Sequence, residues 1–139
     1  MKKILLLLVV LFSFGMNAQE SKVKYINLKR VYDFQEEPNE YRLNTALKQK
    51  MEELGYIVYF DREMPQEVRL DPCLEYTGEL IKEKGSLKTE LTFVLKDCKE
   101  NIVFQNSGVS RLKKHNKSYM DAFQKIFQYS NIGRLKINP

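Results

Sequence analysis

Histidine, cysteine and long apolar runs are scarce in this sequence of 139 residues. Its single histidine, His115, excludes a histidine-rich metal site, and we interpret it as a solvated loop residue rather than a catalytic one. The motif spacings of serine hydrolases, zinc proteases, phosphate loops, dinucleotide-binding folds and EF-hands are missing. We therefore predict no metal, no cofactor and no catalytic residue.

The one long apolar run, Ile4–Phe14, follows two lysines and precedes small and polar residues, which is the order of a secretory signal peptide. It is shorter than the roughly twenty residues that span a bilayer. We predict a signal peptide over residues 1–18, cut after Ala18 or after Ser13-Phe14-Gly15, with an uncleaved membrane anchor as the alternative. No cysteine follows the run to carry a lipid, so we expect a periplasmic or secreted protein.

Loss of the signal peptide would remove two lysines and lower the net charge from +5 to +3. Residues 19–139 are then predicted to form a single α+β domain with an ordered core over about 23–130. A chain of this size, with aromatic and aliphatic residues throughout, can bury a core without a metal. This excludes multidomain, fibrous and wholly disordered organisations.

The first half of the domain predicts strand, helix and strand. Residues 23–32 are rich in β-forming side chains and lead into an acidic loop. A helix capped by Asn39 and ended by Gly55 follows, with Leu43, Leu47, Met51 and Leu54 on one face. Residues 57–60 are continuously apolar, which indicates a strand covered on both sides or in the middle of a sheet. This order predicts a right-handed crossover between two parallel strands.

A hairpin is predicted over residues 73–95, after a polar loop at 61–72, because apolar residues alternate there. Gly85-Ser86 fits a two-residue turn with glycine first. That turn would place Leu80 opposite Leu91.

The same register would set Cys73 opposite Cys98 on one face of the hairpin, within the reach of a disulfide. Export would place both thiols in an oxidising compartment. We therefore predict a Cys73–Cys98 disulfide, with two buried thiols as the alternative.

A third strand from 102 toward 109 and a last helix complete the prediction. Asn116 is expected to cap this helix, which ends near Ser130 and carries an aromatic stripe of Tyr119, Phe123, Ile126 and Phe127. The fold class is thus α+β in the order β-α-β-β-β-α, with one mixed, mainly antiparallel sheet and two helices on one face. The opposite face is a candidate contact surface formed by Thr77, Ile81, Thr92 and Val94.

Positive charge gathers near the end of the chain, where residues 108–139 hold seven basic residues against Asp121. Arg111, Lys113, Lys114 and Lys117 form a candidate patch for an anion or a partner. The Lys113-Lys114-x-x-Lys117 spacing resembles the lysine motif of the double-stranded RNA-binding domain, whose last helix grips phosphates. The aromatic helix departs from that family's Ala-rich one, and export separates the chain from cellular RNA, so we do not expect nucleic acid as the ligand.

The chain also resembles a group of small secreted α+β proteins from Gram-negative, Bacteroidota-type bacteria. The resembling residues are Leu43-Asn44-x-x-Leu47, Leu54-Gly55-Tyr56, Tyr59-Phe60-Asp61, Cys73 and Val94-Leu95-Lys96-Asp97-Cys98. The resemblance implies an envelope or secreted protein, and it transfers no catalytic residue.

Three functions follow as hypotheses. The favoured one is an exported, non-catalytic binding or assembly module of the cell envelope that engages a protein through the sheet face, a sheet edge or the basic patch. The second is a small periplasmic or secreted hydrolase that uses the loop carboxylates of residues 61–67. The third is a polyanion-binding protein that uses the basic start of the last helix.

Overall fold

The computed structural model describes residues 22–85 and 87–135, so the predicted signal peptide lies outside the described residues. β1 (Tyr25–Leu28), α2 (Leu43–Glu53) and β2 (Ile57–Phe60) form the first unit, and β1 and β2 are parallel neighbours, as predicted. Gly55 ends α2 with a φ of 96°, a left-handed conformation that glycine adopts without a steric cost. Within the described ranges, no helix has the length and apolar content needed to cross a membrane.

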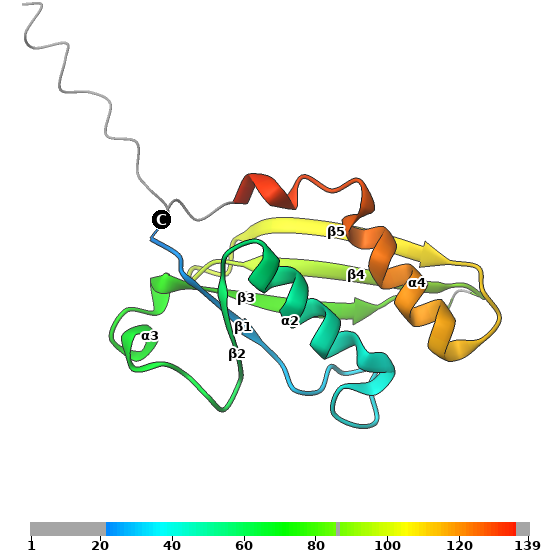
Figure 1. The fold of residues 1–139 in the computed structure, drawn as a ribbon, viewed down its shortest axis with the longest axis horizontal. Coiled ribbons are helices and arrows are strands. Elements are labelled where there is room, and N and C mark those ends of the chain that lie inside the picture. Colours follow the sequence, from blue (N-terminus) through cyan, green and yellow to red (C-terminus); the bar gives the residue numbers. More distant parts are fainter. Residues whose placement is uncertain (1–21, 86, 136–139) are drawn as a thin grey trace, which may run out of the picture.

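Three more strands complete a mixed five-stranded sheet in the order β2-β1-β3-β4-β5. They are β3 (Glu75–Lys82), β4 (Thr89–Lys96) and β5 (Ile102–Ser110). β3 is parallel to β1, whereas β4 is antiparallel to both of its neighbours. Figure 1 shows α2 and α4 (His115–Gln128) side by side over one face of this sheet. The fold is therefore α+β with a mixed sheet, as predicted. The predicted order β-α-β-β-β-α is wrong by one strand, because the sheet has five strands. The sheet is also not mainly antiparallel, since two of its four strand pairings are parallel.

The main core lies between the sheet and the two long helices. α2 contributes Leu43, Leu47 and Met51 to this core, and α4 contributes Tyr119, Phe123 and Ile126. The sheet contributes the buried residues Ile26, Leu28, Leu91, Phe93 and Leu95. Each fully buried side chain of this size contributes about 1.5–3 kcal/mol to folding. The apolar stripes predicted for both helices therefore face the core.

A second, smaller core on the opposite face corrects the prediction for residues 61–72. These residues are not one polar loop, because α3 (Gln66–Leu70) and a 3-10 helix, η3 (Pro72–Leu74), form there. Val68 of α3 packs on Tyr25 and Tyr59, whose side chains point away from the main core. β2 is thus covered on both faces although it is an edge strand, and the description of two helices on one face holds for α2 and α4 only.

The predicted hairpin register is wrong by two residues. Leu80 lies opposite Phe93 rather than Leu91, and the last backbone bond of the ladder joins the Glu83 amide to the Glu90 carbonyl at 3.0 Å. The chain between them is therefore longer than a two-residue turn, although Gly85 has the expected positive φ. A shift of two residues leaves every side chain on its predicted face, because the side-chain period of a strand is two.

The predicted disulfide is confirmed, since Cys73 and Cys98 are bonded with their Cα atoms 4.9 Å apart. The reason differs from the one predicted. Cys73 lies in η3, before β3 begins, and Cys98 lies in the turn after β4. The side chain of Asp71 accepts the Cys73 amide at 3.0 Å and fixes the backbone of η3. The bond therefore joins the two ends of the hairpin outside the ladder.

Candidate functional site

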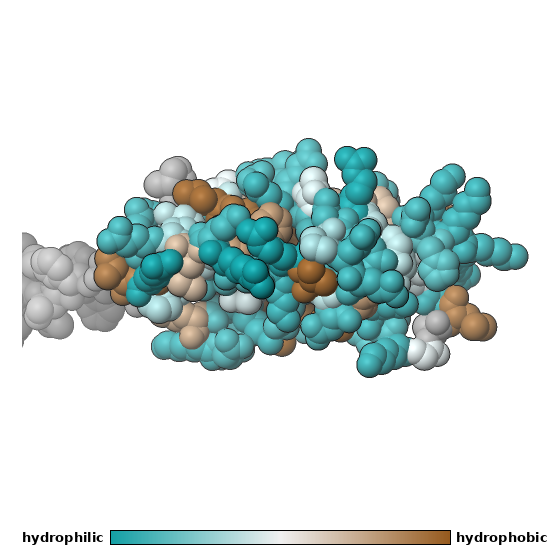
Figure 2. All heavy atoms as spheres, turned by 90° about the horizontal axis from the view of Figure 1, so that it is seen from below, coloured by the Kyte–Doolittle hydropathy of each residue, from teal (hydrophilic) through white to brown (hydrophobic). Residues whose placement is uncertain are grey.

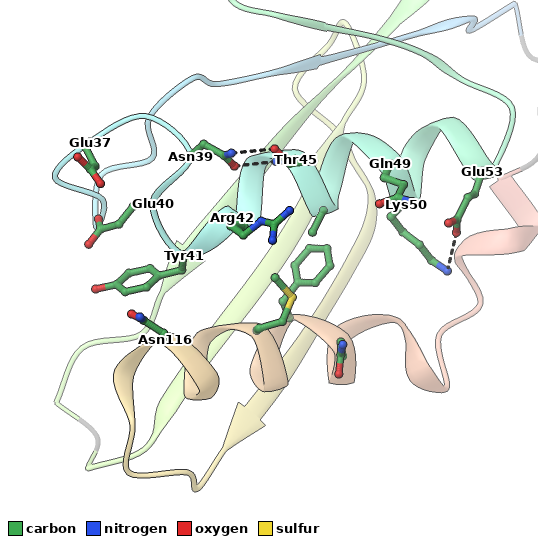
Figure 3. A pocket seen from close by; sticks show the side chains of 14 residues that line it. Glu37, Asn39, Glu40, Tyr41, Arg42, Thr45, Gln49, Lys50, Glu53 and Asn116 are labelled. Atoms are coloured by element: carbon green, nitrogen blue, oxygen red, sulfur yellow. Dashed lines mark hydrogen bonds and ion pairs between the residues drawn. The ribbon is translucent and has the colours of Figure 1, made fainter.

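A groove of about 960 Å³ lies between α4 on one side and α2, with the segment that leads into it, on the other. Ala46, Met120 and Phe123 give it an apolar floor. Its rim is charged with both signs and consists of Glu37, Glu40, Arg42, Lys50 and Glu53. Figure 3 shows Tyr41 lying beside Asn116 of α4, so the groove is bounded by both helices.

The edge of the groove is a strained segment around η2 (Glu40–Arg42). Asn39, Tyr41 and Arg42 have φ values of 58°, 57° and 61°, in the left-handed region. This conformation costs about 1–3 kcal/mol for most residues other than glycine, and asparagine is among the few that adopt it more readily. All three residues line the groove.

Hydrogen bonds from Asn39 hold this segment in place. Its side-chain oxygen accepts the Thr45 amide at 2.9 Å, and its side-chain nitrogen donates to the Thr45 hydroxyl at 2.8 Å. Asn39 therefore satisfies a free amide in the first turn of α2, as a cap does, although Arg42 occupies the position next to the helix. Asn39 therefore accepts a helix amide as predicted, but it does not occupy the capping position of α2.

A buried pair of amides fixes the same segment from inside. Gln35 donates to the Asn44 side-chain oxygen at 2.8 Å and to the Glu40 carbonyl at 3.1 Å. Asn44 donates in turn to the carbonyls of Lys29 and Arg30 at 2.9 and 3.0 Å. The chain that leaves β1 is thereby tied to the start of α2. Such a network confers rigidity because an unpaired buried amide is costly.

Stacked aromatic rings connect the strained segment to α4. The Tyr41 and Tyr119 rings are 4.0 Å apart and nearly parallel, and Phe34 stacks on Tyr119 at 5.8 Å. Loss of hydration, together with the hydrogen bond and charge of Glu40, raises the pKa of Tyr41 to about 12. The Tyr41 hydroxyl therefore stays protonated at pH values where an ordinary tyrosine would already ionise.

A second recess of about 680 Å³ continues the groove along α4. The two share Lys50, Phe123 and Gln124. Lys50 forms an ion pair with Glu53 at 3.5 Å, and its ammonium lies 5.9 Å from the centre of the Phe127 ring. The concave surface therefore extends over most of the length of α4.

The predicted sheet-face residues share one face, as expected. Ile81 pairs with Thr92, and Val94 lies opposite Glu79. Ile81 is 42% exposed, whereas Thr92 and Val94 are buried by neighbouring side chains, and the Thr92 hydroxyl bonds to that of Ser107 at 2.7 Å. Thr77 is half-buried. This surface therefore offers a partner less apolar area than the sequence pattern suggests.

The predicted basic residues Arg111, Lys113, Lys114 and Lys117 are all exposed, where β5 leads into α4. The helix begins at His115 with Lys114 at the capping position, so the predicted Asn116 cap is wrong. His115 is consequently in the first turn of α4 and not in a loop, although it is solvated as predicted.

The carboxylates of residues 61–67 make contacts that hold this segment on the sheet. Arg30 forms ion pairs with Asp61 at 3.9 Å and with Glu63 at 2.5 Å. Glu67 accepts a hydrogen bond from the Tyr25 hydroxyl at 2.9 Å. None of these carboxylates lines the groove.

The sequence carries no signal for the groove. Residues with positive φ are normally predicted from glycine or asparagine, and Tyr41 and Arg42 belong to neither class. The buried pair of Gln35 and Asn44 is equally invisible in a hydrophobicity pattern, because both residues read as surface residues.

Comparison with known proteins identifies a distant structural likeness and no family. No protein-family model and no curated protein matches the sequence. Among solved structures, the chain is similar to a dodecamer of a single-residue variant of PelC from Paraburkholderia phytofirmans, with a TM-score of 0.48 and 14% sequence identity. The match covers 76% of this chain and 87% of that chain.

Proposed function

We propose that this chain is an exported, non-catalytic binding or assembly module that engages a protein partner in the bacterial cell envelope, and that the groove between α2 and α4 is its contact surface. The strained segment carries the proposal. Strained backbone persists only where its surroundings hold it, and it collects at clamps and binding sites. Here Asn39, Tyr41 and Arg42 all have positive φ, and all three line the same groove.

The chemistry of the groove suits a segment of protein. An apolar floor of Met120 and Phe123 takes apolar side chains, and a rim with both charges provides polar contacts around them, as in protein interfaces. Within the described part of the chain, the Arg42 guanidinium makes no hydrogen bond and no ion pair, so its donors are free for a partner. Arginine and tyrosine are also among the residues that most often dominate the binding energy of protein interfaces.

Two observations support the exported location. The Cys73–Cys98 bond is of a kind that persists in oxidising compartments. Two lysines near the start of the sequence also precede a short apolar run, as in secretory signals.

The experiment compares photo-crosslinking amino acids placed singly at three exposed positions in the producing cells. Gln124 lines the groove, Ile81 lies on the open sheet face, and Lys114 belongs to the basic patch. We expect a crosslinked protein adduct from position 124 and none from 81 or 114. The substitution Arg42→Glu should weaken that adduct at least about tenfold, because it reverses the charge of a free groove donor.

Each position tests one surface. An adduct from position 81 alone would move the contact to the sheet face, and one from position 114 alone would move it to the basic patch. Either result would refute the groove as the contact surface. Failure of all three positions to capture protein would refute a protein partner for these surfaces.

A further inference from the structure

One end of the molecule combines exposed leucines with basic side chains. Leu87 is fully exposed and Leu112 is 52% exposed. The exposed basic residues around them are Lys84, Lys88, Arg111, Lys113, Lys114 and Lys117. We call these eight residues the basic tip. Single exposed leucines are common, but two of them among six cations are not explained by the core.

The sheet register brings the two halves of the tip together. Thr89 of β4 pairs with Ser110 of β5, and the Thr89 hydroxyl donates to that of Ser118 at 2.9 Å. Leu87 precedes this ladder pair by two residues, and Leu112 follows it by two. The loop before β4 and the loop after β5 therefore leave the sheet at the same end, where α4 begins, as Figure 1 also shows.

The charge of the tip is strongly one-sided. Residues 108–120 contain no aspartate or glutamate, and the next residue, Asp121, forms an ion pair with Lys125 at 2.9 Å. In the other loop, residues 84–88 are also free of acidic residues, and the flanking Glu83 is exposed, with its carboxylate accepting the Thr92 hydroxyl at 3.4 Å. Figure 2 shows hydrophilic side chains that project from this end, with a hydrophobic group beside them.

We propose that the basic tip docks the protein on the surface of an anionic lipid bilayer. Lysine and arginine side chains near such a surface are attracted by its negative potential, and leucine side chains gain by entering the boundary between headgroups and acyl chains. A soluble polyanion or an acidic protein surface would use the charges and leave the two leucines in water. A bilayer is the partner that accommodates both features. This surface is separate from the groove proposed as the protein contact.

The absence of tryptophan from the sequence permits a direct test. In the full chain, Leu112→Trp places a single tryptophan in the tip. Its fluorescence is followed during titration with vesicles of pure phosphatidylcholine and with an equimolar mixture of phosphatidylcholine and phosphatidylglycerol. We expect a blue shift with the mixed vesicles only, which weakens as salt is added.

A matched reporter separates the tip from the rest of the chain. Tyr129→Trp lies just beyond the far end of α4, about 21 Å from its start at a rise of about 1.5 Å per residue, and Tyr129 is 91% exposed. This tryptophan should remain in water on both kinds of vesicle. The apolar run near the start of the chain is the same in both variants, so any adsorption through it affects them equally.

A third variant tests the charges. Replacement of Arg111, Lys113, Lys114 and Lys117 by glutamine in the Leu112→Trp chain should weaken binding to the mixed vesicles at least about tenfold, because each cation near the membrane contributes about fivefold.

An equal blue shift on neutral and anionic vesicles would overturn the role of the charges. Shifts of both reporters would indicate adsorption without a defined orientation and would overturn docking through the tip. Retention on heparin without a shift of the Leu112→Trp reporter on vesicles would assign the patch to a soluble polyanion and overturn the membrane proposal.

Discussion

Replacement of Gly108 by alanine tests how α4 is seated on the sheet. A Cβ at position 108 of β5 would lie 2.0 Å from the Ala122 carbonyl oxygen and 2.7 Å from the Ile126 nitrogen, both in the backbone of α4. Real contacts of this kind are at least 3.0 Å, so the helix would have to move away by about 1 Å. Added atoms in a well-packed core typically cost about 1–3 kcal/mol, and here no flexible side chain can yield.

We therefore expect Gly108→Ala to lower the free energy of unfolding by about 3 kcal/mol, or the melting temperature by about 10 °C for a domain of this size. Urea unfolding with an unchanged m-value measures the loss.

Two other glycines serve as controls for this experiment. A Cβ at Gly133 would have nothing within 4 Å, so Gly133→Ala should change stability by less than about 0.5 kcal/mol. Gly85 has open space but a φ of 83°, so Gly85→Ala should cost about 1 kcal/mol through backbone strain alone. If Gly108→Ala costs no more than Gly133→Ala, then α4 does not lie against the backbone of β5 as described.

Three further predictions concern the disulfide, the buried amides and the stacked tyrosine. Replacement of both Cys73 and Cys98 by serine should lower the free energy of unfolding by about 3 kcal/mol, as expected for the loop that this bond closes, and urea titration measures it. Two reactive thiols in the unfolded, unreduced protein would contradict the bond. Asn44→Ala should cost about 2 kcal/mol in the same assay, because it leaves the buried Gln35 amide without its acceptor and two partly buried backbone carbonyls without their donor, and a loss below about 0.5 kcal/mol would show that water replaces the amide. The fold raises the pKa of Tyr41 to about 12, whereas an unfolded tyrosine has a pKa of about 10. The contribution of this shift to the free energy of unfolding is therefore complete below pH 10 and is lost as the pH rises to 12. In an ultraviolet titration, Tyr41→Phe should remove a tyrosine that ionises near pH 12. If the tyrosine lost from the titration instead ionises near pH 10, the stacked environment of Tyr41 is refuted.

The parts of the fold that the sequence could predict are those set by periodicity. Leu43, Leu47 and Met51 repeat at helical spacing and are all buried, and the aromatic stripe of α4 behaves in the same way. A single stripe decides which face of a helix is apolar, and this information survives in one sequence. α3 was missed because only Val68 of its five residues is buried, too little for a periodic signal.

The hairpin shows why a correct contact can follow from an incorrect register. The hydrophobic pattern of a strand shows which face each side chain is on, but shifting the register by two residues leaves that pattern unchanged. The pattern therefore could not distinguish Leu80 opposite Leu91 from Leu80 opposite Phe93. The disulfide joins Cys73 and Cys98 from η3 and a turn, where backbone geometry is not bound to the ladder. The bond requires only that the two ends of the hairpin lie close together. It does not require the predicted residue-by-residue pairing.

The candidate site depends on interactions that no local pattern encodes. Tyr41 and Arg42 are left-handed because Asn39 binds Thr45 from one side and the Gln35–Asn44 pair anchors the chain from the other. A connection that served only to join β1 to α2 could place glycine at these positions and avoid the cost. The chain instead places there a tyrosine that stacks on α4 and an arginine with free donors. The strained residues Tyr41 and Arg42 are held in place by a hydrogen-bond network, and their side chains line the groove. A binding role for this segment therefore explains the strain better than a role as a simple connection between β1 and α2.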